Sequence, residues 1–339
     1  MKVIRLAGIL TLVILLASCS LVHIWPEPGQ EVDPTIIETK VEVTCQVDID
    51  IQTVITRGDV ADRSDKDLYQ RRFLVNIYEA LSGHDTLVFS DTFLHDVGSV
   101  DRNLSFTTTL QARRYNIVVW MDFIKRDTGD DLYYNTQNGF NAIHVRPIEE
   151  YQANDDFKDA QTFFYPVDLT TVTEWFTNIV IEVPMQRPIA KITFVTTDFQ
   201  EYARKIGCPD DSISELAKDY EIRMSYNGYL PTGYNALTQK LNDSEVGYHY
   251  TSVPSWRADE NVARLGFDYV FVNGEQSSVN MSVEVVRKSD GAVVNRVDNI
   301  TVPIYRGKET VVKDKFFTRE YTPGIGINPE FDGEFNVYV

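Results

Sequence analysis

Residues 38–55, ETKVEVTCQVDIDIQTVI, alternate between apolar and polar side chains. The apolar series is Val41, Val43, Cys45, Val47, Ile49 and Ile51, with acidic, amide or hydroxyl side chains between its members. A period of two rich in β-branched residues is typical of a strand with one buried face. The stretch predicts a long first β-strand, which must find partners further along the chain.

Six more strand patterns follow before residue 187. The run 115–123, YNIVVWMDF, is almost continuously apolar, which favours a central strand buried on both faces. Residues 127–139 are polar and predict a loop. Short strands separated by turn signals predict a β-sandwich over residues 38–186. The six predicted strands are 73–79, 85–94, 104–111, 115–123, 159–167 and 178–183.

The pattern restarts after the proline-flanked residues 184–188 and predicts a second β-sandwich over residues 187–339. Residues 210–218 interrupt it with one short helix, begun by Asp210, Asp211 and Ser212. Residues 227–233 predict a turn, and Asn273-Gly274 and Asp290-Gly291 predict hairpin turns. The fold class is thus all-β, two tandem sandwiches with one helical excursion. The predicted strands are 189–196, 220–226, 246–253, 264–272, 279–287, 299–304, 310–317 and 335–339.

The chain begins with the features of a secretory signal peptide over residues 1–18. Lys2 and Arg5 precede an apolar run, 6–17, that is too short to span a bilayer comfortably. The residues Leu16-Ala17-Ser18-Cys19 resemble the lipobox of bacterial lipoproteins, which implies cleavage before Cys19 and acylation of Cys19 with palmitate-like chains. Residues 19–37, with three prolines, would then be a tether. An ordinary signal peptide with a coincidental cysteine is the alternative.

Composition limits the partners of the chain. Its 339 residues are 43% hydrophobic, which is typical of a globular protein. The net charge of −18 repels nucleic acid and anionic headgroups, so attachment to a membrane would depend on acylated Cys19. Cys45 and Cys208 remain, and we expect two separate buried thiols, although the sequence leaves their pairing open.

No pattern in the sequence predicts catalysis, a metal site or a cofactor. No two of the five histidines have metal-ligand spacing, and there is no nucleophile elbow, phosphate loop or dinucleotide fingerprint. Three acidic pairs are interpreted as solvated loop and helix-cap residues; a hydrolase with two converging carboxylates is the alternative. The pairs are Asp130-Asp131, Asp155-Asp156 and Asp210-Asp211, and the histidines are His23, His84, His95, His144 and His249.

Several segments resemble one family, the fimbrillin-like lipoproteins of the Bacteroidales. Residues 115–122, YNIVVWMD, resemble a strand motif of that family, and 187–192, RPIAKI, resemble the start of its second domain. Residues 302–312 and 328–333 resemble its C-terminal segment. The order of these motifs after a lipobox carries the resemblance, which covers most of residues 38–339.

The resemblance implies transthyretin-like (Ig-like) sandwiches and a role in type V fimbriae at the outer membrane. In that family an Arg-specific protease removes the first strand, and a donor strand from another subunit fills the groove, a form of β-augmentation. Here the cut would follow Arg57 or Arg63, and residues 335–339 are the candidate donor strand or its neighbour. A plain loop role for Arg57 is the alternative.

The sequence departs from the family at two places near its C-terminus. Asp314 stands where a glycine is usual, and residues 307–309, GKE, replace a more basic turn. These departures weaken the assignment as a polymerising stalk subunit. The interpretation is a non-enzymatic, lipid-anchored outer-membrane protein at the cell surface, a fimbrial subunit or anchor in cell adhesion. The alternative is a stand-alone surface lipoprotein that binds glycan or host protein.

Overall fold

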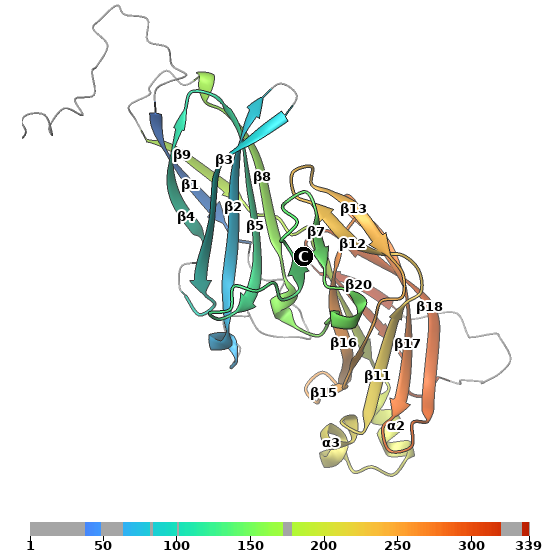
Figure 1. Cartoon of the computed structure of the whole chain (residues 1–339). Coiled ribbons are helices and arrows are strands. Elements are labelled where there is room, and N and C mark those ends of the chain that lie inside the picture. The colour runs from blue at the N-terminus through green and yellow to red at the C-terminus, as the bar shows by residue number, and fades with distance from the viewer. Residues whose placement is uncertain are drawn as a thin grey trace, which may run out of the picture.

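The computed structural model of the chain describes residues 38–48, 64–81, 84–99, 102–171, 178–319 and 334–338. These residues fold into five β-sheets and two short α-helices (Figure 1). Most strands gather into two lobes, and the fifth, small sheet lies between them. The all-β fold class predicted from the sequence is confirmed.

The N-terminal lobe consists of two sheets, A and B, that pack face to face. Phe106 of sheet A lies 5.6 Å, between ring centroids, from Phe89 and Phe93 of sheet B. Sheet A contains β4 (Leu104–Gln111), β1 (Glu38–Gln46) and β9 (Ile179–Pro184), in that order. Sheet B contains β3 (His84–Asp96), β2 (Tyr69–Leu81), β5 (Arg114–Lys125) and β8 (Gln161–Asp168).

The C-terminal lobe consists of sheets D and E, which also pack face to face. Tyr226 of sheet E donates a hydrogen bond to Asp268 of sheet D, with 2.7 Å between the oxygens. Sheet D contains β15 (Ser255–Arg257), β16 (Val262–Phe271), β10 (Ile189–Thr196), β19 (Glu309–Asp314) and β20 (Glu334–Tyr338). Sheet E contains β14 (His249–Ser252), β11 (Tyr220–Tyr226), β17 (Gln276–Arg287) and β18 (Val293–Tyr305).

The two lobes share one path of strand connections. The first strand of the N-terminal lobe, β1, lies between antiparallel β4 and parallel β9. The first strand of the C-terminal lobe, β10, likewise lies between antiparallel β16 and parallel β19. Sheets B and E match in the same way, since β3-β2-β5-β8 corresponds to β14-β11-β17-β18. This repeated path explains why the alternating pattern restarts near residue 189.

Sheet C pairs strands from the two halves of the chain. It contains β13 (Lys240–Glu245), β12 (Leu230–Asn235), β7 (Ile143–Val145) and β6 (Tyr134–Asn135). The sequence predicted a loop at 127–139 and a turn at 227–233, and both predictions were wrong in part, because β6 lies in the first segment and β12 begins in the second. These strands are short and find partners far away in the sequence, so they carry little alternation of their own.

Buried aromatic side chains connect sheet C to both lobes. Trp120 of β5 packs against Tyr134 at 5.4 Å and Tyr234 at 6.1 Å between ring centroids. Phe271 of β16 stacks on Tyr234 at 5.5 Å. All four side chains are at most 1% exposed. Because large buried aromatic rings contribute strongly to core stability, this cluster ties sheets B, C and D together.

The helices are short and both belong to the C-terminal lobe. The predicted helix at 210–218 is confirmed by α3 (Ile213–Ala217) and the 3₁₀ turn Asp210–Ser212. A second helix, α2 (Phe199–Lys205), was missed because its seven residues make only about two turns. Among the described residues, no helix has the length and apolar character needed to cross a membrane. Further 3₁₀ turns are Lys66–Leu68, Ile148–Glu150, Asp156–Lys158 and Leu169–Thr171.

Most strand predictions are confirmed, and β4, β10 and β11 have the predicted bounds. The first strand is shorter than predicted, because β1 ends at Gln46; residues 49–55 lie outside the described residues. The hairpin turn at Asp290-Gly291 is confirmed, since it joins the paired strands β17 and β18. The one at Asn273-Gly274 was wrong, because it joins β16 of sheet D to β17 of sheet E.

Candidate strand-exchange site

The first strand, β1, is the central strand of sheet A. Its residues 38–45 pair with β4, and residues 41–46 pair with β9 on the other side. The backbone of β1 therefore supplies partners to two neighbouring strands at once. Removing β1 would leave both β4 and β9 with unpaired N–H and C=O groups that face one vacant groove.

One face of β1 belongs to the core of the N-terminal lobe. Val41, Val43 and Cys45 are 0% exposed. In register, Val43 lies beside Phe106 of β4 and Ile181 of β9, both of them buried. Burial of a valine side chain stabilises a fold by about 1.5–3 kcal/mol. Any strand that replaced β1 would have to supply apolar side chains at these alternating positions.

The opposite face of β1 is open to solvent. Glu38 and Lys40 are exposed, and Glu42 and Thr44 are partly buried. The only side-chain hydrogen bond described for this face joins the hydroxyl groups of Thr44 and Ser105 at 3.0 Å. Side-chain contacts on this face therefore hold β1 in place only weakly.

The end of β1 is fixed by polar contacts rather than by more strand pairing. Met185 donates its backbone N–H to the Gln46 carbonyl oxygen at 2.8 Å. Asn103 Oδ1 accepts from the Val47 N–H at 3.0 Å. Gln161 exchanges two hydrogen bonds with the Asp48 backbone, at 2.9 and 3.0 Å. Side chains thus replace strand partners at Val47 and Asp48, which explains why β1 ends at Gln46.

A buried arginine connects this end of β1 to the segment between β9 and β10. Arg187 is 2% exposed, and its Nη1 lies 2.6 Å from Asp48 Oδ2. The same guanidinium binds both carboxylate oxygens of Asp159, at 2.8 and 2.9 Å. Asp159 can keep the arginine paired if Asp48 leaves. Nothing in the sequence marks Asp48 as a site residue. Its partner Arg187 begins the segment 187–192 that resembles the start of a second fimbrillin-like domain.

The two cysteines that follow Cys19 in the sequence are both free thiols, as expected. Cys45 is buried in the core, and burial raises the pKa of its thiol to about 12. Such a thiol stays protonated and unreactive near neutral pH. Cys208 is only partly buried, so the expectation that both would be buried is correct for Cys45 alone.

The residues predicted to carry lipid or to be cleaved lie outside the described residues: Cys19, Arg57 and Arg63. Their roles stay predictions. The candidate donor strand, predicted at 335–339, forms β20, which pairs antiparallel with β19 at one edge of sheet D.

The acidic pairs hold the structure together more than the sequence suggested. Asp131 lies 2.8 Å from Arg72 and is 3% exposed at its side chain, so it is not a solvated loop residue. Asp156 lies 2.7 Å from Lys191. Asp155 accepts a hydrogen bond from the Phe157 N–H, and Asp210 pairs with Arg204 at the surface, which agrees with cap and surface roles.

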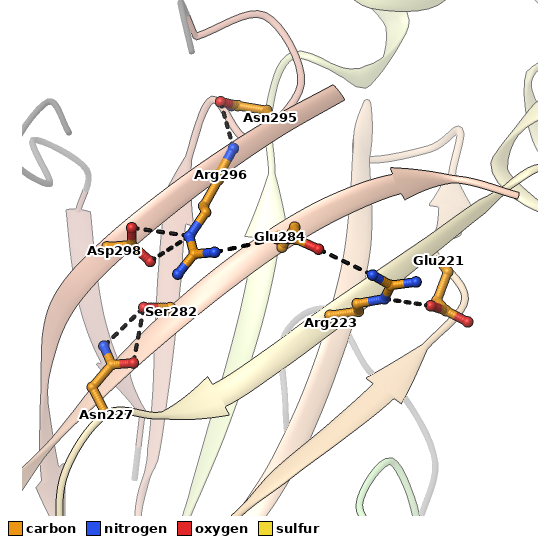
Figure 2. A network of polar contacts seen from close by, with 8 residues as sticks. All are labelled: Glu221, Arg223, Asn227, Ser282, Glu284, Asn295, Arg296 and Asp298. Atoms are coloured by element: carbon orange, nitrogen blue, oxygen red, sulfur yellow. Dashed lines mark hydrogen bonds and ion pairs between the residues drawn. The ribbon is translucent and has the colours of Figure 1, made fainter. Parts of the chain in front are cut away.

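Sheet E carries an exposed network of ion pairs (Figure 2). Arg223 of β11 binds Glu221 at 2.7 Å and Glu284 of β17 at 3.3 Å. Arg296 of β18 binds the same Glu284 at 3.4 Å and Asp298 at 2.9 Å. Exposed pairs of this kind contribute about 0–1 kcal/mol each, so the network is best explained as the solvated face of a sheet.

A glycan platform would require exposed aromatic side chains close together. Among the described residues, the large exposed aromatic side chains are Tyr165, on β8, and Tyr229, between β11 and β12. They belong to different lobes. The described residues therefore offer no aromatic cluster for stacking sugars.

One described histidine lies next to carboxylates. His144 of β7 is within reach of Asp243 and Glu245 of β13, and together they are the group whose ligand atoms could hold a metal ion. The sequence predicted no metal site because His144 lies 99 positions before Asp243. No spacing rule would have found them.

Comparisons with known proteins extend over most of the chain. The model of a family described as "Family of unknown function (DUF6562)" matches residues 33–339. A comparison with curated proteins gave no match.

Several solved structures are similar to this chain. A candidate polysaccharide-binding protein (DUF1812) from Bacteroides thetaiotaomicron has 9% identity and a TM-score of 0.45, over 82% of this chain and 92% of that one. The fimbrial anchor protein Mfa2 from Porphyromonas gingivalis has 12% identity and a TM-score of 0.39, over 81% and 90%. A candidate cell adhesion protein from Bacteroides eggerthii has 11% identity and a TM-score of 0.40, over 90% and 97%. Two of these structures are a fimbrial anchor and a candidate cell adhesion protein, the kind of protein that the sequence resembles.

Proposed function

Because this chain belongs to DUF6562, a family of unknown function, we propose a role from its own geometry: a non-enzymatic surface subunit or anchor of a fimbria that can exchange its first strand. The observation that carries the proposal is the central place of β1 in sheet A, between β4 and β9. A strand in that place leaves a groove between β4 and β9 when it is removed, and an extended segment from another chain can fill such a groove.

Attachment to the outer membrane is the second part of the proposal. The lipobox Leu16-Ala17-Ser18-Cys19 supports acylation of Cys19, and the acyl chains would hold the protein at the cell surface. The negative charge of the chain gives no electrostatic help. Other copies of this protein or other fimbrial subunits are the proposed partners.

The third part of the proposal is a division into two domains, residues 38–186 and 187–339. The shared strand path of the two lobes supports this division, since each lobe has its own first strand and its own parallel last partner. Sheet C pairs β7 of the first domain with β12 of the second, so backbone hydrogen bonds would connect the two domains.

An uncut anchor is the second candidate, and one contact favours it. Arg187 holds Asp48 at 2.6 Å, which fixes the end of β1 beside the start of the C-terminal lobe. A strand tied at that end leaves less readily than one held by sheet pairing alone. An anchor would keep β1 and accept its partner elsewhere.

The first experiment determines the N-terminus of the mature protein by mass spectrometry on purified outer membranes. A free terminus at Gly58 or Ser64 would support removal of β1 and strand exchange. A fully acylated Cys19 on the intact chain would support the anchor. Absence of acyl groups on a chain that starts elsewhere would contradict both forms of the proposal.

The second experiment tests exchange directly with a soluble form that begins at Ser20. Treatment with an Arg-specific protease followed by incubation should give SDS-resistant oligomers. The double variant Arg57→Lys/Arg63→Lys keeps the charge but should resist cleavage and stay monomeric. Oligomers of equal amount from this variant would contradict a role for cleavage at these residues.

A further inference from the structure

Three polar side chains of sheet C converge across its middle strand. His144 lies on β7, and Asp243 and Glu245 lie on β13, on the far side of β12. His144 Nε2 is 3.3 Å from Asp243 Oδ2 and 3.7 Å from Glu245 Oε1. All three ligand atoms lie within 4.8 Å of one another.

A glycine makes this convergence possible. Gly233 of β12 is the register partner of both His144 and Asp243, so it stands between them in the sheet. A Cβ atom added to Gly233 would lie 2.6 Å from Asp243 Cβ and 2.5 Å from Asn242 Oδ1. Because the glycine has no side chain, the side chain of Asp243 can extend across β12 toward the imidazole of His144.

Each of the three side chains also has its other polar atom occupied. His144 Nδ1 lies 3.0 Å from the Val145 carbonyl oxygen, which can only accept, so Nδ1 carries the proton. Asp243 Oδ1 accepts from the Ser244 N–H at 2.8 Å. Glu245 Oε2 accepts from the Tyr248 hydroxyl at 3.3 Å. These contacts orient Nε2, Oδ2 and Oε1 toward one another, as outer hydrogen bonds do around metal ligands.

The three converging atoms cannot satisfy one another. In neutral histidine with the proton on Nδ1, Nε2 presents a lone pair, and both carboxylate oxygens present lone pairs as well. A cation among the three atoms would satisfy all of these lone pairs, and solvent can reach the site, since the side chains of His144, Asp243 and Glu245 are 27%, 55% and 46% exposed. Zinc bonds to nitrogen and oxygen of about 2.0–2.2 Å imply tetrahedral ligand separations of about 3.3–3.6 Å, close to the separations that His144 makes.

We propose that His144, Asp243 and Glu245 bind a divalent transition-metal ion, with zinc as the best-fitting ion and solvent in the fourth position. One imidazole and two carboxylates form a ligand set that zinc accepts in tetrahedral coordination. The ion would connect β7 from the first half of the chain to β13 from the second half. It would therefore strengthen the sheet that joins the two lobes.

The test uses the soluble chain from Ser20 without a histidine tag, stripped with EDTA and dialysed. Calorimetric titration with zinc sulfate at pH 7.5 should give one ion per chain, and zinc should raise the melting temperature. The variant His144→Gln should lower zinc affinity at least about tenfold. The matched control is His249→Gln, since His249 is exposed on β14 with its Nδ1 bound to the Gly247 carbonyl oxygen; it should bind zinc as the parent does.

A second variant separates metal binding from folding. Gly233→Ala should weaken zinc binding, because the added Cβ atom would displace the side chain of Asp243. Circular dichroism would show whether the sheet is retained. Absence of zinc binding by the parent would overturn the proposal. Equal zinc binding by the parent and His144→Gln would also overturn it, because the ion would then lie elsewhere.

Discussion

The strands β1 and β10 hold the same position in the two lobes, but their surroundings differ. Each is a first strand with an antiparallel neighbour on one side and a parallel neighbour on the other. Along β1, buried residues alternate with exposed or partly buried ones. All eight residues of β10 are buried. The same topology therefore gives a half-open strand in one lobe and a fully enclosed strand in the other.

Residues 148–160 account for part of this difference. Asn154 pairs with Phe267 along the edge of β16, with its N–H donating to the Phe267 carbonyl oxygen at 2.9 Å and its Oδ1 accepting at 2.7 Å. Asp156 from the same segment binds Lys191 of β10 at 2.7 Å. Residues 148–160, from the first half of the chain, thus cover part of sheet D in the C-terminal lobe.

The same segment supplies a buried charge to the C-terminal lobe. Lys158 Nζ lies 2.6 Å from Asp268 Oδ1, and the two side chains are 1% and 0% exposed. Tyr151 and Tyr226 donate to the other oxygen of Asp268, at 2.6 and 2.7 Å. Burial lowers the pKa of Lys158 despite its partner. The C-terminal lobe therefore depends on contacts that the N-terminal half provides, whereas β1 is held mainly by its own sheet.

The edges of the two equivalent sheets differ as well. In sheet D, β20 covers the edge of β19. In sheet A, β9 is the last strand among the described residues, and its Val180 is 56% exposed. A strand edge with apolar exposed residues is a place where another strand can pair. Among the described residues, the N-terminal lobe therefore has the more accessible first strand and the more accessible sheet edge.

One threonine on β1, Thr44, and one on β10, Thr193, give the largest expected contrast. Thr193 is 0% exposed and donates to Glu309, so Thr193→Asp would bury two carboxylates side by side. We expect a loss of more than about 4 kcal/mol, often with failure to fold. Thr44→Asp, on the outer face of β1, should cost less than about 1 kcal/mol. Urea unfolding compares the two, and Thr193→Val is the control for loss of the hydroxyl group. Equal costs would mean that β1 is as enclosed as β10.

The buried ion pair between Lys158 and Asp268 gives the second-largest expected effect. Lys158→Met leaves Asp268 charged and buried, and loss of one partner from such a pair costs about 3–5 kcal/mol. The matched control Arg296→Met removes the exposed ion pairs of Arg296 with Glu284 and Asp298 and should cost about 1 kcal/mol or less. Hydrogen exchange should show the loss of protection in β16 before β2. A cost for Lys158→Met no greater than for the control would contradict the dependence of the C-terminal lobe on residues 148–160.

The Cys45 thiol provides a pH-dependent test of whether β1 stays in place. Its pKa is about 12 in the folded protein and about 9.0 when exposed, so unfolding is favoured as pH rises from about 9 toward 12. Stability should fall by up to about 1.4 kcal/mol per pH unit in that window and be unaffected by this thiol below it.

Labelling with iodoacetamide at pH 8 gives the complementary result. Cys208 should react in the intact protein, while Cys45 should react only after β1 is released. The variant Cys45→Val should lose the pH dependence assigned to this residue. Rapid labelling of Cys45 in the uncut protein would mean that β1 already leaves its sheet spontaneously.

The open edge of β9 gives the smallest expected change in stability. Because Val180 is exposed, Val180→Lys should change the free energy of unfolding by no more than about 0.5 kcal/mol. The added charge should nevertheless reduce association through that edge, which light scattering of concentrated protein can measure. A loss above 1 kcal/mol would show that another part of the protein covers this edge.

Much of the fold could be predicted because the alternation of apolar and polar residues along a strand shows which of its side chains are buried. The bounds of β4 and β11 follow from a period of two, and β5 is buried along nearly its whole length, as its apolar run predicted. Sheet C could not be predicted, because its strands are two to six residues long and are paired between the halves of the chain. The residues that terminate β1 were likewise hidden, since Asn103 and Gln161 act through side chains.

The sequence by itself determined the all-β class, the restart near residue 189 and the half-buried first strand, because each depends on neighbours along the chain. Only the tertiary structure decided which strand lies in the centre of sheet A and why β10 is enclosed while β1 is not. Two contacts also became known only from the tertiary structure. Asp48 contacts Arg187, 139 positions away, and His144 contacts Asp243, 99 positions away. Such contacts depend on how sheets pack, and no periodicity in the sequence records that.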